Sequence, residues 1–126
     1  CNAFFPREDE RSYLAAQGIQ MQAWSPLAAG QGSLFENETL RAIAAAHGKS
    51  VAQVVLRWLV QRGIVPLAKS ANPVRMRENL AIFDFSLTEP EMQAIAALDT
   101  GHTCFAARTT AESVQAFLEA AEKFNV

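Results

Sequence analysis

The sequence contains few of the residues that mark specialised protein classes. It has only two cysteines, Cys1 and Cys104, and their separation fits neither a metal-ligand motif nor a disulfide framework. We expect free thiols in a reducing compartment, and hence a cytoplasmic protein. Neither sign of charge dominates, because the net charge is −2 and the pI is about 5.7. The chain as a whole has no attraction to nucleic acid or anionic lipid, so any anion site must be local.

Long apolar runs are also lacking. The longest, VAQVVLRWLV, is interrupted by Gln53 and Arg57 and cannot span a bilayer. No apolar leader, low-complexity linker or repeat of fixed period is evident. Half of the residues are apolar and 19% are charged, as in a soluble globular domain.

What the sequence does contain is an alternation of helix signals and short strand-like runs. The predicted strands cover 19–24 and 64–68, and the second is short, β-branched and apolar, as a buried strand should be. Helices are predicted over 7–17, 38–47, 51–62, 73–81, 89–98 and 110–124. Asn37 and Asn72 can act as N-caps, and Ser50 with Gln53 and Thr88 with Glu91 have the spacing of a capping box. This order indicates a parallel α/β architecture, in which ligand sites lie in the loops after the strands.

One such loop is unusually cationic for this chain. In LAKSANPVRMRENL, the second predicted strand delivers Lys69 and Ser70 to the edge of the sheet. The helix that starts at Asn72 points its free N–H groups at the same place. Arg75 lies in the first helical turn, where a cation opposes the helix dipole unless an anion lies beside it. The pattern predicts an anion pocket.

The alternative is that Lys69 and Arg75 are solvent-exposed charges on a surface turn and bind no ligand. Spacing alone leaves both interpretations open. Arg77 points elsewhere around the helix and is predicted to be a solvated surface charge.

The segment LAKSANPVRMREN resembles the cofactor-binding segment of the aldo-keto reductases, where a Lys-Ser pair ends the eighth barrel strand. Four further segments resemble, in order, the end of strand six, strand seven with its loop, helix seven, and the tail after helix eight: CNAFFPRED, GIQMQAWSPLAAGQG, AAAHGKSVAQVVLRWLVQRGIV and FDFSLTEPEMQAIAALDTG.

The resemblance implies an α/β fold class, namely the C-terminal part of a (β/α)8 TIM barrel. The expected content is the end of strand 6 through strand 8, helix 8 and the C-terminal tail, as a single partial domain, 1–126. The length agrees, since such a barrel needs ~250 residues. The abrupt start at Cys1 suggests that an upstream part is missing.

The resemblance also assigns a cofactor site for NADPH. Lys69, Ser70 and Arg75 would hold its 2′-phosphate, and Trp24 would stack on the nicotinamide ring. Asn72 would assist at the helix start, and Ala71 would contribute its backbone. The adenine would contact Glu78 and Asn79, and the pyrophosphate would be lined by Ser25, Pro26 and Leu27. Without the resemblance, Trp24 would be interpreted as an ordinary core or rim aromatic residue.

The family's catalytic Asp, Tyr, Lys and His belong to the part of the barrel outside this chain. Tyr13 falls in a predicted surface helix and matches none of them, and His47 and His102 are likewise unmatched. We therefore expect no catalytic residue and no metal ligand here. Phe105, in the tail, would either face the substrate site or anchor the tail.

The function implied is NADPH-dependent reduction of aldehydes or ketones to alcohols by hydride transfer in the complete barrel, with the isolated fragment inactive. The expected partner is a small carbonyl substrate, with no nucleic acid or membrane. The complete enzyme is expected to be a monomer, whereas the fragment is expected to self-associate.

Two other functions remain in view. The chain could be a non-catalytic nucleotide-binding or interaction fragment. It could also hold a DNA-binding helix-turn-helix, because LRAIAAAHGKSVAQVVLRWLVQRG contains two helices around a glycine. The second helix, however, presents mostly apolar side chains, which leaves few polar groups for base edges.

Overall fold

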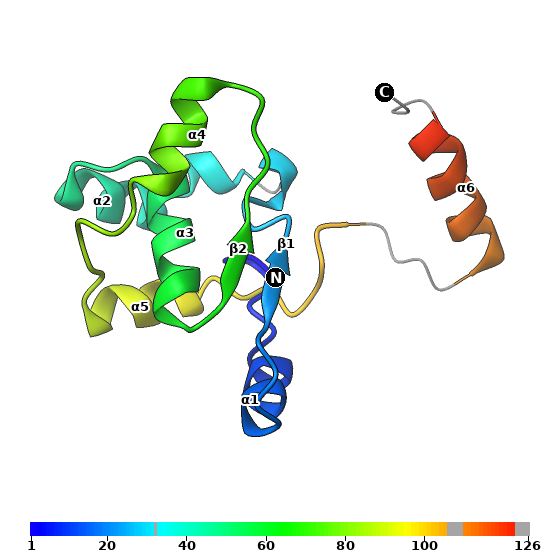
Figure 1. The fold of residues 1–126 in the computed structure, drawn as a ribbon, viewed down its shortest axis with the longest axis horizontal. Helices are drawn as coiled ribbons and strands as arrows, with labels where there is room; N and C mark the ends of the chain where they lie inside the picture. Colours follow the sequence, from blue (N-terminus) through cyan, green and yellow to red (C-terminus); the bar gives the residue numbers. More distant parts are fainter. Residues whose placement is uncertain (32, 106–109, 123–126) are drawn as a thin grey trace.

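The computed structural model describes residues 1–31, 33–105 and 110–122, with helices and two short strands alternating along the chain (Figure 1). The elements in order are α1 (Glu8–Ala16), β1 (Gln22–Trp24), η1 (Ala28–Gly30), η2 (Leu34–Glu36), α2 (Glu38–His47), α3 (Val51–Gln61), β2 (Val65–Leu67), α4 (Pro73–Leu80), α5 (Glu89–Ala96) and α6 (Ala111–Glu122). All six predicted helices are therefore confirmed within a few residues of their ends. The last two residues of the helix predicted over 110–124 lie outside the described ranges.

The two strands run parallel and side by side, with Ala23 opposite Pro66 and Trp24 opposite Leu67. The connection between them carries η1, η2, α2 and α3, so it is the helical crossover that a parallel pair requires. Because the pair is parallel, the loops after Trp24 and after Leu67 leave the sheet at the same end, where both strands have their carboxyl termini. This arrangement brings the two candidate site loops together.

Local capping explains where the central helices begin. Asn37 Oδ1 accepts from the Leu40 N–H at 3.1 Å at the start of α2. At the start of α3, Ser50 and Gln53 form the predicted capping box, with hydrogen bonds of 3.2 Å and 3.0 Å between each side chain and the other residue's N–H. Gly48, between these helices, has a positive φ of 61°, which glycine adopts without strain.

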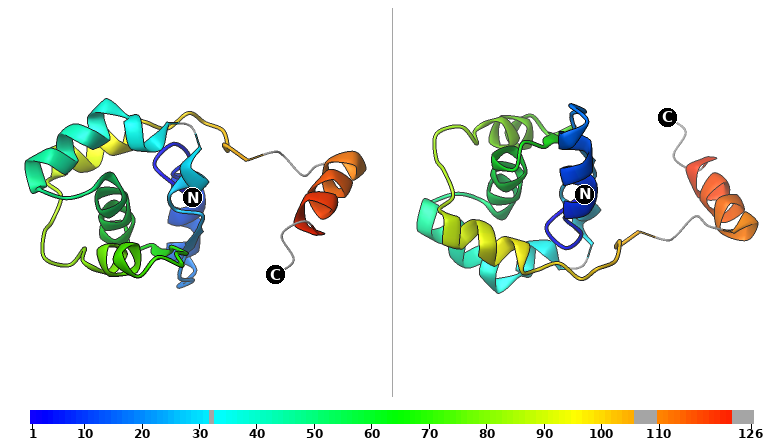
Figure 2. Two further views of the ribbon diagram at one scale, coloured as in Figure 1. Left: turned by 90° about the horizontal axis from the view of Figure 1, so that it is seen from above. Right: turned by 90° about the horizontal axis from the view of Figure 1, so that it is seen from below.

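The core lies where α2 packs against α3 and α5, and Figure 2 shows these helices from two further sides. Trp58 is at its centre, fully buried, and its Nε1 donates to the Met92 carbonyl oxygen at 3.3 Å. The cluster draws on α2, α3, α5, η2, both strand regions and the N-terminal turn, but not on α1 or α4: Ala3, Ala23, Leu34, Leu40, Ile43, Ala44, Val54, Val55, Trp58, Leu59, Ile64, Leu87 and Ile95.

The sequence prediction that 64–68 is a buried strand is wrong in part. Ile64 is buried, but Val65 is 43% exposed and Leu67 is 49% exposed. Successive side chains of a strand point to opposite faces, and α3 packs against β2 from one side only. The described residues leave the other face of β2 largely open.

This open face predicts self-association of the isolated chain. A two-stranded sheet has an unpaired edge on each strand, and Val65, Leu67 and Trp24 add exposed apolar surface beside it. We expect the purified chain to form concentration-dependent oligomers in sedimentation velocity. A monodisperse monomer with a sharp two-state melt would contradict this prediction.

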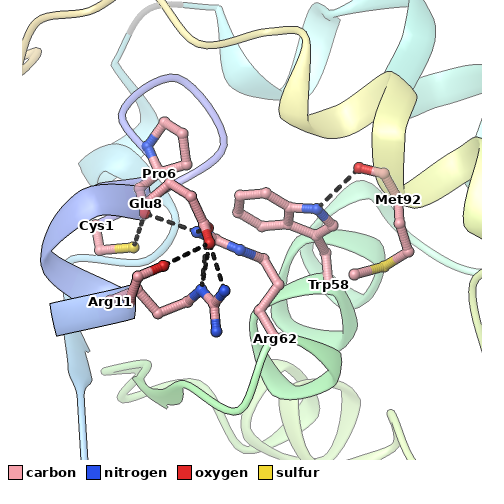
Figure 3. Close-up of polar contacts among 8 residues, drawn as sticks. Cys1, Pro6, Glu8, Arg11, Trp58, Arg62 and Met92 are labelled. Atoms are coloured by element: carbon pink, nitrogen blue, oxygen red, sulfur yellow. Dashed lines mark hydrogen bonds and ion pairs between the residues drawn. The ribbon is translucent and has the colours of Figure 1, made fainter. Parts of the chain in front are cut away.

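A cluster around Arg62 ties α1 to the core (Figure 3). Arg62 Nη2 donates to the Pro6 carbonyl oxygen at 2.9 Å and to Glu8 Oε2 at 2.8 Å. Its guanidinium lies 4.2 Å from the centre of the Trp58 ring. Arg11 also contacts the Glu8 carboxylate. The hydrogen bond from Arg11, together with that from Arg62, lowers the pKa of Glu8 from 4.5 to about 2.

The lowered pKa of Glu8 predicts a pH dependence for the docking of α1. Because the folded-state pKa is below the usual 4.5, the carboxylate stabilises the fold above pH 4.5, and this contribution is lost as the pH falls towards 2. Glu8 is half exposed, so solvent limits the contribution to below about 1 kcal/mol. In a ¹³C NMR titration of the Glu8 carboxyl group, Arg11→Met should raise the midpoint more than Arg62→Met. A wild-type midpoint near 4.5 would be inconsistent with this cluster.

Candidate functional site

The turn between β2 and α4 is organised by two side chains. Ser70 Oγ accepts from the Asn72 N–H at 3.1 Å. Asn72 Oδ1 in turn accepts from the N–H groups of Val74 at 2.9 Å and Arg75 at 3.3 Å, so Asn72 is the predicted N-cap of α4. These hydrogen bonds therefore fix the backbone conformation of the turn between β2 and α4.

These contacts correct one part of the sequence argument. The N–H groups of Val74 and Arg75 were expected to be free for an anion, but both are hydrogen-bonded to Asn72. Pro73 has no N–H to offer. The side-chain donors that remain for an anion at this turn include the ammonium of Lys69 and the guanidinium of Arg75, whereas the hydroxyl of Ser70 donates at 3.4 Å to the Asn72 carbonyl oxygen.

A cavity of about 380 Å³ lies between this turn, α4 and the start of α3. Six of the predicted site residues line it, and Lys69 and Arg75 set two positive charges against the single carboxylate of Glu78. The full lining comes from five parts of the chain: Leu27, Phe35, Ser50, Val51, Ala52, Lys69, Ser70, Arg75, Glu78 and Asn79.

A second hollow of about 460 Å³ adjoins the first, since Leu27 and Lys69 line both. It lies between the loop after β1 and the end of β2, and its walls include Trp24, Ser25 and Pro26. Nine of the eleven predicted site residues thus line two connected hollows at one edge of the sheet. Ala71 and Asn72 line neither, and Asn72 acts on the helix start instead.

The wall contributed by Phe35 and by the start of α3 was not predicted from the sequence. The capping box at Ser50 was evident, but nothing in its local pattern indicates that Ser50, Val51 and Ala52 face the loop after β2. This contact joins segments about twenty residues apart in the chain, so only the packing of α3 beside α4 brings it about.

Trp24 is 60% exposed, so it is not a core residue. The ring of Phe105 packs against it, with centroids 4.9 Å apart and planes tilted by 55°. Phe105 therefore anchors the tail onto Trp24 and also lines, with it, the large hollow of about 840 Å³ on the open side of β1. The tail residues 106–108 lie outside the described ranges.

The other residues considered for catalysis lie outside the two connected hollows. Tyr13 is exposed on α1, as predicted, and lines the hollow of about 840 Å³ instead. His47 Nε2 lies 2.9 Å from Glu91 Oε1 and joins the end of α2 to α5. His102 is an exposed loop residue. Among residues 1–31, 33–105 and 110–122, no group of three or more His, Cys, Asp or Glu could hold a metal ion, and no helix could cross a membrane.

Comparison with known proteins places this geometry in a family context. The chain matches the Aldo/keto reductase family over residues 1–100. It is 50% identical over 99 residues to the glyoxal reductase of Bacillus subtilis (strain 168), covering 76% of this chain and 35% of that protein.

Two solved structures show the same fold. An aldo-keto reductase enzyme from a Medee basin deep-sea metagenome library matches with a TM-score of 0.82 and 33% identity, over 87% of this chain and 41% of that one. A Bombyx mori aldo-keto reductase in complex with NADP matches with a TM-score of 0.77 and 32% identity, over 84% of this chain and 37% of that one. The α/β barrel fold class is supported by these matches, and the chain spans between 35% and 41% of the length of these relatives.

Proposed function

The chain belongs to the aldo/keto reductase family, and from that premise we propose that it forms the NADPH-binding part of an oxidoreductase that reduces small aldehydes or ketones. Within the (β/α)8 barrel it would supply the end of strand 6 through strand 8, helix 8 and the tail. The names of two relatives, glyoxal reductase and methylglyoxal reductase, support a small carbonyl substrate.

The observation that carries this proposal is the cavity beside Lys69 and Arg75. Its volume of about 380 Å³ is within the range of small-molecule sites. Two residues with cationic side chains line it, and the N–H groups of Val74 and Arg75 in the first turn of α4 are already bonded to Asn72. Such a donor set fits a phosphate group, because a dianion beside two cations forms charge-assisted hydrogen bonds.

The residues of this cavity fit the adenosine end of NADPH. Lys69 and Arg75 would hold the 2′-phosphate, and the Ser70 hydroxyl would turn from the Asn72 carbonyl oxygen, 3.4 Å away, to donate its proton to the same group. Glu78 and Asn79 line the same cavity and carry the acceptors and donors that an adenine edge requires. Asn72 would act indirectly, since it fixes the first turn from which Arg75 projects.

The adjoining hollow fits the other end of the cofactor. Ser25, Pro26 and Leu27 would line the pyrophosphate, and the exposed face of Trp24 would hold the nicotinamide ring at one angle. NADPH, when bound, supplies the hydride for carbonyl reduction. The part of this chain is to bind and orient the cofactor, because no described residue matches the general acid of the family.

Binding tests this proposal without any need for turnover. In the full-length protein that contains this chain, NADP⁺ should bind at least about tenfold more tightly than NAD⁺ in isothermal titration, since only NADP⁺ offers a partner to both cations. Adenosine 2′,5′-bisphosphate should compete with NADP⁺, whereas AMP should compete weakly. Equal affinity for NADP⁺ and NAD⁺ would contradict the assignment.

A further inference from the structure

Gln53 is a polar residue on the buried face of α3. Its exposed fraction is 8%, and only Asn2 joins it as a buried polar residue among the residues that the structure describes. Burying a primary amide is costly unless all of its donors and acceptors find partners. The partners of this side chain therefore indicate what it does.

All the partners of the Gln53 side chain are backbone groups at two helix ends. Its Nε2 donates to the carbonyl oxygens of Ala81 at 2.9 Å and Glu78 at 3.2 Å, which lie at the end of α4. Its Oε1 accepts from the Ser50 N–H at 3.0 Å, at the start of α3. One amide thus joins the first turn of α3 to the last turn of α4.

Residues of both helix ends line the cavity of about 380 Å³. Ser50, Val51 and Ala52 form the wall on α3, and Glu78 and Asn79 belong to the wall on α4. Gln53 lines no part of the cavity, yet it fixes the separation of the segments that do. Figure 1 shows α4 lying against α3.

The position of α4 depends on few other interactions. The helix has eight residues and buries none of them, so apolar packing contributes little to holding it. A helix of this length is also marginal on its own. The two hydrogen bonds from Gln53 are therefore a large part of what holds α4 to the core.

We infer that Gln53 is a positioning residue that sets the width of the adenosine-phosphate cavity and thereby the affinity for NADPH. The inference rests on the proposed function, because the ligand of the cavity is the cofactor named there. Gln53 does not touch the cofactor. It acts through α4, the helix that carries Arg75, Glu78 and Asn79.

The chain provides a matched control eight residues further along the same helix. Gln61 Nε2 donates to the Leu87 carbonyl oxygen at 3.0 Å, and its Oε1 accepts from the Leu87 N–H at 2.7 Å. Gln61 is thus a second side-chain bridge from α3 to the backbone, but it leads to the segment before α5 and lines neither connected hollow.

The test compares Gln53→Met with Gln61→Met in the full-length protein that contains this chain. Methionine keeps the length of the side chain and removes the hydrogen bonds. Both variants should lower Tm. Only Gln53→Met should weaken NADPH binding. The expected loss is about tenfold in affinity, which corresponds to the loss of one or two hydrogen bonds. Without cofactor, only Gln53→Met should speed hydrogen exchange in the peptide covering residues 76–82.

Gln53→Glu provides a second variant that keeps the α3 cap. Its carboxylate can still accept from the Ser50 N–H but cannot donate to the carbonyl oxygens of Glu78 and Ala81. It should therefore show the same loss of NADPH affinity and the same faster exchange in α4. This variant separates the bridge from the capping of α3.

Unchanged NADPH affinity in both Gln53 variants, or equal loss in Gln61→Met, would overturn the inference. Unchanged exchange in α4 would overturn it as well, because the bridge would then not hold the helix. Failure of the proposed function is recognised separately, since the wild-type protein would then not bind NADPH at all, and the inference would fall with it.

Discussion

The purified 126-residue chain is expected to consume no NADPH above background with any aldehyde or ketone. The only tyrosine, Tyr13, is exposed on α1 and lines neither connected hollow. Neither histidine lines them: His47 is paired with Glu91, and His102 lies in an exposed loop. A positioned general acid alone contributes about 10²- to 10⁴-fold to such a reaction. The measurement is the loss of NADPH absorbance with a panel of carbonyl compounds.

Turnover by the isolated chain would contradict the proposal that the catalytic residues lie elsewhere in the barrel. The same assay on the full-length protein is the positive control. A full-length protein that binds NADPH but reduces no carbonyl compound would instead favour the non-catalytic nucleotide-binding interpretation. The two outcomes therefore separate an incomplete enzyme from a binding module.

Arg75→Ala is expected to weaken NADPH binding by about ten- to a hundredfold in the full-length protein. A hydrogen bond to a charged group contributes roughly 1.5 to 3 kcal/mol, and each 1.4 kcal/mol is about tenfold in affinity. NADH binding should barely change, because NADH has no 2′-phosphate for this guanidinium to hold. Lys69→Ala should show the same asymmetry, since its ammonium lines the same cavity.

Arg77→Ala is the control for general electrostatic effects. Arg77 is exposed on the same helix and lines neither connected hollow. Its removal changes the net charge by the same amount as Arg75→Ala. The ratio of the two dissociation constants should therefore stay close to that of the wild type in Arg77→Ala. An equal effect on both cofactors in Arg75→Ala would show that Arg75 does not hold the 2′-phosphate.

The features that sequence predicted well are local. Asn37, Ser50, Asn72 and Thr88 were each predicted to start a helix, and each stands at the N-cap position. Such contacts span two or three residues, so the side chain and its partner are visible together in a short window of sequence. The parallel pairing was also predicted, because strands that alternate with helices are typical of a parallel α/β architecture.

The features that sequence predicted poorly depend on packing between distant segments. Val65 is β-branched and apolar, as a buried strand residue usually is, yet the described residues leave its face of β2 open. The bridge from Gln53 to Ala81 spans 28 residues and leaves no local pattern beyond the capping box. The N–H groups at the start of α4 can donate either to the Asn72 side chain or to a bound anion. The spacing of the residues does not indicate which of the two they bind, and in the structure they bind Asn72.

The central claim is that Lys69 and Arg75 hold the 2′-phosphate of NADPH, and ³¹P NMR of NADP⁺ bound to the full-length protein tests it most directly. A phosphate monoester has its second pKa at about 6. Two adjacent cations favour the dianion, so the 2′-phosphate resonance should titrate at a lower pH when bound, and Arg75→Ala should move the midpoint back towards the free value. A bound 2′-phosphate that titrates as in free NADP⁺, and that does not respond to Arg75→Ala, would contradict the account.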